Sequence, residues 1–134
     1  MIVLDASVTV ELVLATPTGD KVESLIEKAG ESLNAPHLLS VEVTHVLRRF
    51  VRSKTITAKS AQSALGELSG LPINRWRHEP LIARMWDLRN NLTAYDATYV
   101  ALAEALEAKL ITTDARLHRF ATALIDVEIV DTLN

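Results

Sequence analysis

The sequence predicts one α/β domain, a three-layer α/β/α sandwich around a short parallel sheet. Short segments of strand length alternate along the chain with segments of helical period, the pattern of strand–helix–strand crossovers. The chain has 134 residues, of which 49% are hydrophobic and 23% charged. That length and composition allow one core and exclude disorder, but they leave no room for two domains of ordinary size. We therefore expect residues 1–134 to form a single domain.

Five short segments are predicted strands because they are apolar or extended runs bounded by polar or turn-forming residues. The first is wholly apolar and stops at Asp5, which is typical of a buried strand, and the third follows a break at Gly70-Leu71-Pro72. Since the strands alternate with helices, we expect the sheet to be parallel and covered on both faces. The segments are residues 2–4, 34–36, 73–76, 109–112 and 127–130.

Residues 8–14, 20–29 and 38–51 are the first three predicted helices. The run Thr16-Pro17-Thr18-Gly19 is predicted to end the first helix as a loop, and Gly30 suits the C-terminal cap of the second. In the third, the apolar positions share one face, which predicts an amphipathic helix packed on the core.

The remaining predicted helices lie in the second half of the chain. Pro80 stands where one of them would begin. The helical pattern is clearest after residue 92, where Tyr95 and Tyr99 fall in the apolar stripe and are therefore expected in the core. These helices are residues 57–68, 80–89, 93–108 and 115–124.

Composition excludes several functional classes. The chain has no cysteine, so it has no disulfides, thiolate metal sites or cysteine nucleophiles. No apolar run approaches the roughly 18 residues of a membrane span, and the first residues lack the basic start of a signal peptide. The four glycines are scattered, which argues against a phosphate-binding loop and a nucleotide cofactor. We expect a cytoplasmic protein without a membrane partner.

Charge is segregated along the chain. The formal net charge is −3, from 14 basic and 17 acidic residues, which taken alone argues against a nucleic-acid partner. Residues 1–47 carry a net −5 and residues 90–134 a net −4, whereas residues 48–89 carry +6. The basic middle segment is therefore available to a polyanion or to an acidic partner, and the sequence leaves the choice open.

Four acidic residues stand where a parallel sheet forms its ligand site. Asp5 and Asp114 follow two of the predicted strands, while Glu42 and Asp96 lie early in two of the predicted helices. Because ligands of such sheets bind beyond the carboxyl ends of the strands, all four acids could meet at one edge. Each also has a simpler interpretation as a helix cap or a solvated charge.

Converging carboxylates would repel one another, which raises their pKa values or recruits cations. Oxygen-only ligands favour Mg²⁺ or Mn²⁺ over zinc, and Mg²⁺ keeps several waters while one or two carboxylates hold it. Such an ion can activate a water and neutralise the charge that builds on a phosphodiester. The acids are thus predicted to hold metal, and basic residues to hold the polyanion.

Four segments resemble the acidic motifs of PIN-domain proteins, in the right order over essentially the whole chain. They are Met1-Ile-Val-Leu-Asp5-Ala-Ser7, residues 34–49, residues 92–103 and Leu110-Ile-Thr-Thr-Asp114. The length is most similar to that of VapC-type toxins of bacterial toxin–antitoxin pairs. This resemblance implies a PIN-like fold and a Mg²⁺- or Mn²⁺-dependent endoribonuclease that cleaves RNA, forms a homodimer and is silenced by a cognate antitoxin.

The resemblance also implies roles for individual residues. Asp5 and Asp96 are expected to contact the metal directly. Many relatives have a further acid just after the fourth acidic position, where this chain has Arg116 and His118, which leaves open whether the site holds one or two metals. The implied catalytic and metal-binding residues are Asp5, Glu42, Asp96 and Asp114.

Other residues have weaker predictions. Ser7 and Thr112 match small polar positions near the acidic site, and Arg89 precedes the Asp96 helix, so these three are candidates for substrate binding. Trp76 and Trp86 could stack on bases, but with so few aromatic residues in the chain we expect them to pack in the core or at a dimer interface. Four cations near the end of the 38–51 helix either stabilise its C-terminus or contact phosphate or antitoxin; they are Arg48, Arg49, Arg52 and Lys54.

Competing functional classes differ at identifiable positions. A haloacid-dehalogenase-like phosphatase would need a second aspartate where Ser7 stands, and a receiver domain would need a lysine after a late strand, yet no lysine follows Lys109. The remaining alternative is a non-catalytic PIN-like binding module that acts through a protein partner.

Overall fold

The computed structural model describes residues 1–132, which contain a five-stranded sheet of order β3-β2-β1-β4-β5. Neighbouring strands are parallel throughout, which confirms the predicted parallel sheet. The chain moves from β1 outward to β2 and β3, then returns to β4 and β5 on the other side of β1. The topological switch point, where open α/β sheets bind ligands, therefore lies between β1 and β4. The strands are β1 Ile2–Leu4, β2 Leu33–Pro36, β3 Ile73–Trp76, β4 Lys109–Thr112 and β5 Val127–Ile129.

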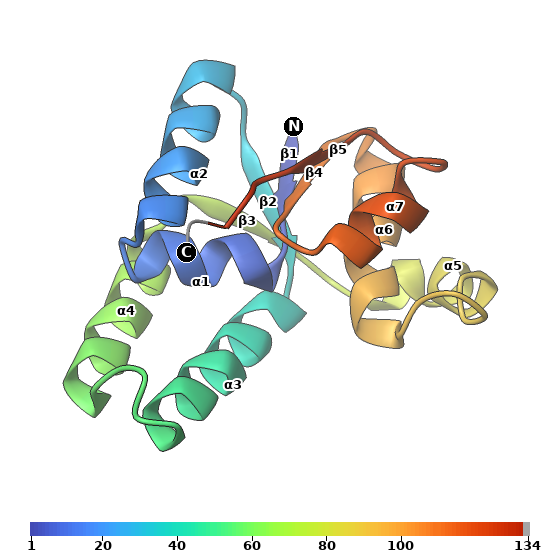
Figure 1. Cartoon of the computed structure of the whole chain (residues 1–134). Helices are drawn as coiled ribbons and strands as arrows, with labels where there is room; N and C mark the ends of the chain where they lie inside the picture. Colours follow the sequence, from blue (N-terminus) through green and yellow to red (C-terminus); the bar gives the residue numbers. More distant parts are fainter. Residues whose placement is uncertain (133–134) are drawn as a thin grey trace.

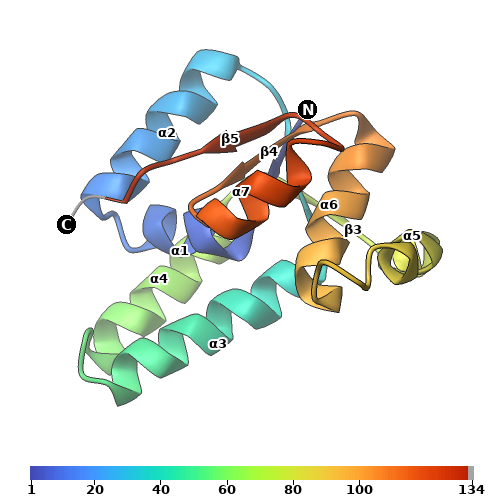
Figure 2. The same cartoon turned by 45° about the vertical axis from the view of Figure 1, so that its right-hand side comes forward.

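Helices cover both faces of the sheet, as the predicted sandwich requires. α5, α6 and α7 lie on one side, at the right of Figure 1, and α1 and α2 lie on the other. α3 and α4 pack against each other as a hairpin that extends below the sheet in Figures 1 and 2. Among the described residues, no helix combines the length and apolarity that a membrane span needs. The helices are α1 Ala6–Val13, α2 Pro17–Ala29, α3 Leu38–Arg52, α4 Ala58–Gly70, η1 Glu79–Leu81, α5 Ile82–Asp87, α6 Ala94–Leu106 and α7 Ala115–Ala121.

Side chains of β1 alternate between two cores because successive strand residues point to opposite faces. Val3 packs in the larger core, which contains Tyr99 of α6. Ile2 and Leu4 belong to a smaller core on the other face, together with Val22 of α2. β1 is therefore buried on both faces, and its packing fixes the position of Asp5, the residue that follows it.

Side-chain caps start several helices and account for one wrong prediction. Thr16 is the N-cap of α2 and accepts a hydrogen bond from the backbone N–H of Gly19, while Pro17 is the first helical residue. The predicted loop over residues 16–19 is therefore wrong. Gly30 ends α2 with a left-handed φ of 60°, as predicted.

Four further predictions differ from the structure. Residues 80–89 form a 3₁₀ turn followed by the short helix α5, and α7 ends three residues before residue 124. Tyr95 is 60% exposed, because it lies in the first turn of α6. Trp76 and Trp86 are 40% and 66% exposed, which excludes core packing and leaves the dimer interface and base stacking as predictions.

α1 and α2 meet at a close corner. A Cβ atom at Gly19 would lie 2.2 Å from the carbonyl oxygen of Glu11, so only glycine fits at this position. The hydroxyl of Thr16 contacts both the carboxylate and the carbonyl oxygen of Glu11. The corner therefore fixes the C-terminal end of α1 against α2.

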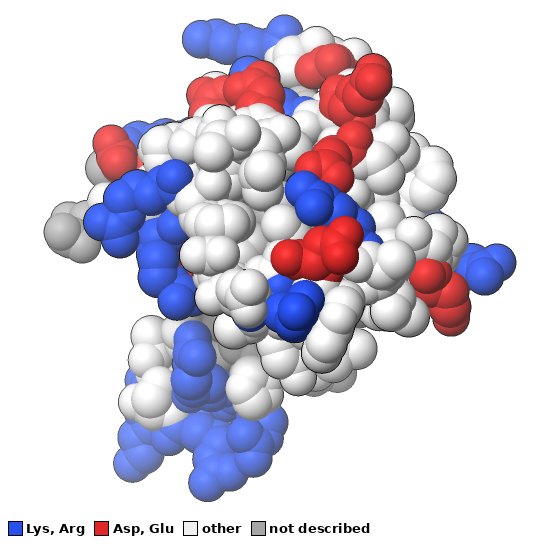
Figure 3. Space-filling view, turned by 90° about the vertical axis from the view of Figure 1, so that its right-hand side faces the viewer, with Lys and Arg blue, Asp and Glu red and all other residues white. Residues whose placement is uncertain are grey.

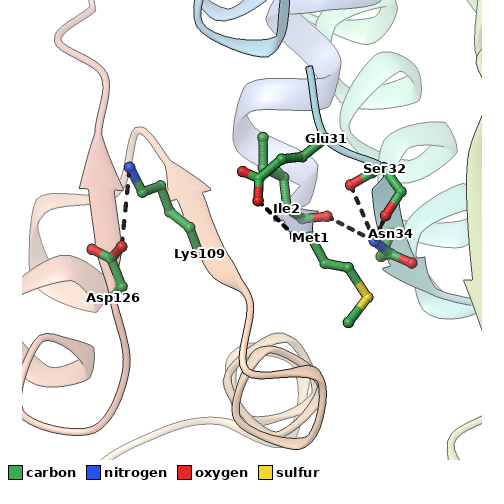
Figure 4. A network of polar contacts seen from close by, with 7 residues as sticks. All are labelled: Met1, Ile2, Glu31, Ser32, Asn34, Lys109 and Asp126. Atoms are coloured by element: carbon green, nitrogen blue, oxygen red, sulfur yellow. Dashed lines mark hydrogen bonds and ion pairs between the residues drawn. The ribbon is translucent and has the colours of Figure 1, made fainter. Parts of the chain in front are cut away.

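Charges at the amino edge of the sheet are paired, as Figure 4 shows. The N-terminal amine of Met1 lies 3.0 Å from Glu31, and Nζ of Lys109 lies 4.0 Å from Asp126. Asn34 Nδ2 donates to a β1 carbonyl oxygen at 3.3 Å, which ties β2 to β1. At the carboxyl edge of the sheet, by contrast, acidic side chains gather in one cavity.

Candidate functional site

One cavity of about 300 Å³ brings together the four predicted acids at the carboxyl edge of the sheet. Asp5 directly follows β1, and Asp114 follows β4 at the topological switch point. Glu42 comes from the early part of α3, and Asp96 from the first turn of α6. The prediction that these residues meet at one edge is confirmed, although their chemical role stays a prediction.

Asp5 is the most deeply buried of these acids, with 6% of its surface exposed. Its carboxylate accepts hydrogen bonds from the hydroxyls of Ser7 and Thr112 at 2.6 and 2.5 Å, and from the backbone N–H of Val8 at 3.2 Å. Burial raises the pKa of Asp5 to about 6, and the three hydrogen bonds oppose that rise. Asp5 is also the N-cap of α1, so the simpler interpretation holds as well.

Ser7 and Thr112 connect Asp5 to the turn after β4. The Ser7 hydroxyl accepts from the backbone N–H of Thr113 at 2.9 Å, and the Thr112 hydroxyl accepts from that of Asp114 at 3.0 Å. Each hydroxyl has one hydrogen, and that hydrogen is directed to Asp5. These residues therefore position Asp5, and their predicted contact with substrate would have to use oxygen lone pairs.

Glu42 and Tyr99 place two buried polar atoms in the site without hydrogen-bond partners among the described residues: Glu42 Oε1 and the Tyr99 hydroxyl. Burial raises the pKa of Glu42; the nearby Tyr99 hydroxyl, although it forms no hydrogen bond of normal geometry, opposes that rise, and the charge of Asp96 adds to it. The pKa of Tyr99 is also raised, first by burial and then by Glu42, Asp5 and Asp96. Buried polar atoms without partners indicate a place for water or an ion.

Asp96 and Asp114 complete the acidic wall. Burial, followed by the charge of Asp114, raises the pKa of Asp96, whereas Arg116 lowers it from a distance of 3.6 Å. Asp114 is the N-cap of α7, and its Oδ1 accepts from the N–H groups of Arg116 and Leu117 at 2.9 and 3.1 Å. Its other carboxylate oxygen takes no part in this cap.

Sequence reasoning did not place three polar residues of the cavity in the site: Glu11 was not singled out, Arg49 was named only as a cation near the end of its helix, and Tyr99 only as a core residue. Arg49 lies seven residues after Glu42, two helical turns along the same face of α3, so its position could have been read from the period. Arg89 does not line the cavity; its guanidinium stacks 4.4 Å from the ring centre of Trp86. Its contact with RNA stays a prediction.

The oxygen donors fit a hard divalent ion. The cavity is lined by five carboxylates, including Glu11, and by a single arginine, Arg49. Within residues 1–132, no group of three or more His, Cys, Asp or Glu side chains is arranged so that it could hold a metal ion. Because Mg²⁺ needs only one or two carboxylates and keeps its waters, the unpartnered Glu42 Oε1 and the roomy acidic cavity agree with such an ion.

Comparisons with known proteins agree with this geometry. A family model described as PIN domain matches residues 2–123. Ribonuclease VapC1 of Mycobacterium tuberculosis is 54% identical over 85 residues, which are 63% of this chain and only 64% of that protein. Ribonuclease VapC12 of the same organism is 38% identical over 130 residues, covering 97% of this chain and 99% of that protein. A chain in the crystal structure of VapBC2 from Rickettsia felis bound to a promoter DNA fragment shares the fold, with a TM-score of 0.70, 16% identity and coverage of 98% and 100%.

Proposed function

The chain belongs to the PIN-domain family, and from this membership we propose that it is a divalent-metal-dependent endoribonuclease, the toxin of a toxin–antitoxin pair. The observation that carries the proposal is the cavity at the switch point, where Asp5, Glu42, Asp96 and Asp114 lie together. The curated relatives that are named ribonucleases support RNA as the substrate.

Mg²⁺, or Mn²⁺ in its place, is the proposed cofactor. Asp5 and Asp96 are its first proposed ligands, and Glu42 and Asp114 complete the wall around it. When bound, the ion lowers the pKa of water and offsets the negative charge that develops on a phosphodiester during attack. The same positive charge would favour the ionised forms of Asp5, Glu42 and Asp96, whose pKa values burial raises in its absence.

The chain's own groups supply orientation. The hydroxyls of Ser7 and Thr112 hold both oxygens of Asp5, so its carboxylate cannot rotate away from the cavity. The free Oε1 of Glu42 can accept a proton or a hydrogen bond from an attacking water, and the Tyr99 hydroxyl can donate to that water or to Glu42. Arg49, at the rim, offers a cation to a phosphate.

The experiment expresses the chain without an antitoxin and maps new RNA ends with Mg²⁺ and with chelator. Asp5→Asn removes one charge from the cavity, and Asp131→Asn makes the same change at an exposed position. We expect cleavage in the parent and in Asp131→Asn, and none in Asp5→Asn or in chelator. Cleavage that persists in chelator would overturn the metal-dependent mechanism. A cellular effect that survives Asp5→Asn would instead favour the non-catalytic binding module.

The proposal also includes the protein partners of the chain and its cellular location. The similar fold of a chain in the VapBC2 structure supports an antitoxin as the protein partner. Exposed apolar side chains at Ile82, Trp86 and Tyr95 support a homodimer, which light scattering of the purified chain would test. We propose a cytoplasmic location for the toxin.

A further inference from the structure

Lysine and arginine gather at one end of the molecule. Figure 3 shows them clustered at the lower end, where Figure 1 places the α3–α4 hairpin. We call this group the hairpin tip; it consists of Arg48, Arg49, Arg52, Lys54 and Lys59. Between Glu42 and Glu67 the chain has these five cations and no acidic residue.

The cations of the hairpin tip lie at the surface, where the Arg49 guanidinium stacks 5.8 Å from the centre of the Phe50 ring. All five are exposed, and none forms an ion pair with another described residue. Lys54 occupies a left-handed turn with φ of 62°, a conformation that glycine or asparagine adopts more easily. Lysine therefore occupies a turn position whose backbone conformation favours glycine or asparagine.

α3 connects the hairpin tip to the acidic cavity. Glu42 and Arg49 both line the cavity and lie two turns apart on the same face of this helix. Arg52 follows three residues later, in the last turn of the helix, and Lys54 comes just beyond it. A chain that enters the cavity and follows α3 outward therefore meets cations one after another.

We infer that the hairpin tip binds the phosphate backbone of the single-stranded RNA on one side of the cleavage site, an inference that rests on the proposed function. Contacts to phosphate come from arginine, lysine and hydroxyl side chains. The hydroxyls of Ser53, Thr55 and Thr57 in this turn already form hydrogen bonds within the chain, so we assign the phosphate contacts to the cations. Protein interfaces are anchored by tryptophan, tyrosine and arginine side chains in buried pockets, and of these three residue types the segment 48–60 has only arginine. Among the described residues, no exposed large hydrophobic side chain lies between residues 48 and 60.

Salt-dependent binding of RNA tests this inference without cleavage. The probe is a fluorescein-labelled single-stranded RNA oligonucleotide, and the background variant is Asp5→Asn, which prevents turnover. Arg48→Gln with Arg52→Gln removes two tip cations, and Lys21→Gln with Lys28→Gln removes two exposed cations of α2 as the matched control. Arg48→Lys with Arg52→Lys keeps the charge and detects structural damage.

The expected result follows from counterion release, at about 0.7 per neutralised phosphate of a single strand. The slope of log affinity against log salt should fall by about 1.4 in the tip variant, which is about 25-fold in affinity at 0.1 M salt. The α2 and lysine variants should keep the parental slope. An unchanged slope in the tip variant, or an equal loss in the α2 variant, would overturn the inference.

Two outcomes distinguish a failure of the proposed function from a failure of the inference about the hairpin tip. If the tip variant loses RNA affinity but the parent cleaves no RNA, the proposed function fails and the binding surface stands. If the tip variant keeps the parental affinity for RNA but binds poly-L-glutamate more weakly, the hairpin tip binds an acidic protein and the inference is overturned.

Discussion

Replacing Asp5 by asparagine should make the metal-free protein more stable at neutral pH. Burial raises the pKa of Asp5 from 3.8 to about 6, in spite of three hydrogen bonds that lower it. At about 1.4 kcal/mol per pKa unit, the ionised Asp5 costs the folded state about 3 kcal/mol relative to the unfolded chain. Asparagine avoids this cost but accepts weaker hydrogen bonds from Ser7 and Thr112, so we expect a net gain of about 1–2 kcal/mol.

The sign of the pH dependence follows from the same pKa values. The folded protein binds the Asp5 proton more tightly than the unfolded chain, so the free energy of unfolding of the parent falls as pH rises between about 4 and about 6. Below about pH 4 the Asp5 penalty is absent, and above about pH 6 it is complete. The advantage of Asp5→Asn should grow over this window and then stay constant.

Urea-induced unfolding followed by far-UV circular dichroism measures this advantage, in chelator and at several pH values between about 4 and about 7.5. Asp131→Asn is the matched control, because it removes the same charge at an exposed position. Saturating Mg²⁺ should reduce or reverse the advantage, since the ion stabilises the folded parent. A parent as stable as Asp5→Asn near pH 7.5 in chelator, or a difference independent of pH, would refute the reasoning.

Three other substitutions test the site and its support. Gly19→Ala should lower the free energy of unfolding by about 1–3 kcal/mol, because its Cβ would meet the Glu11 backbone, whereas Gly66→Ala has open space and should gain up to about 1 kcal/mol; urea unfolding compares them. Tyr99→Phe should slow RNA cleavage by about 10-fold or more with little change in melting temperature, since the buried hydroxyl faces Glu42 without a hydrogen bond of normal geometry; an unchanged rate would exclude it from the site. Thr112→Val should raise the pKa of Asp5 and move the acid limb of the cleavage profile to higher pH, an effect that Thr112→Ser should not reproduce.

The order and type of the elements could be predicted because strands and helices of this chain carry distinct periods. Residues 73–76 and 109–112 match β3 and β4 to the residue, since turn-forming or charged residues bound them. The start of α2 was misread because threonine and proline are typical both of loops and of the first residues of helices. Tyr95 was placed in the same stripe as Tyr99, but at the start of α6 the buried positions are Ala97 and Thr98, and Tyr95 is exposed.

The site was predictable only in part. Asp5 and Asp114 could be placed from the ends of strands, since parallel strands deliver their carboxyl ends to one edge. Glu42 and Asp96 needed the resemblance to PIN-domain proteins, because no local spacing relates them to the strands. Glu11 lines the cavity because the corner between α1 and α2 holds it there. That corner depends on the contact between Glu11 and Gly19, eight residues apart, which the helical and strand periods of the sequence do not predict.

α1 is anchored at both ends, by Asp5 at its start and by the Gly19 corner near its end. Two cavity acids, Asp5 and Glu11, flank or lie on this one short helix, so neither can move without displacing the other. A local opening that released α1 would expose core residues such as Val8 and Val10 at the same time. Backbone amides of α1 should therefore exchange with deuterium only through openings close to global unfolding, and the acidic wall should keep its shape between encounters with RNA.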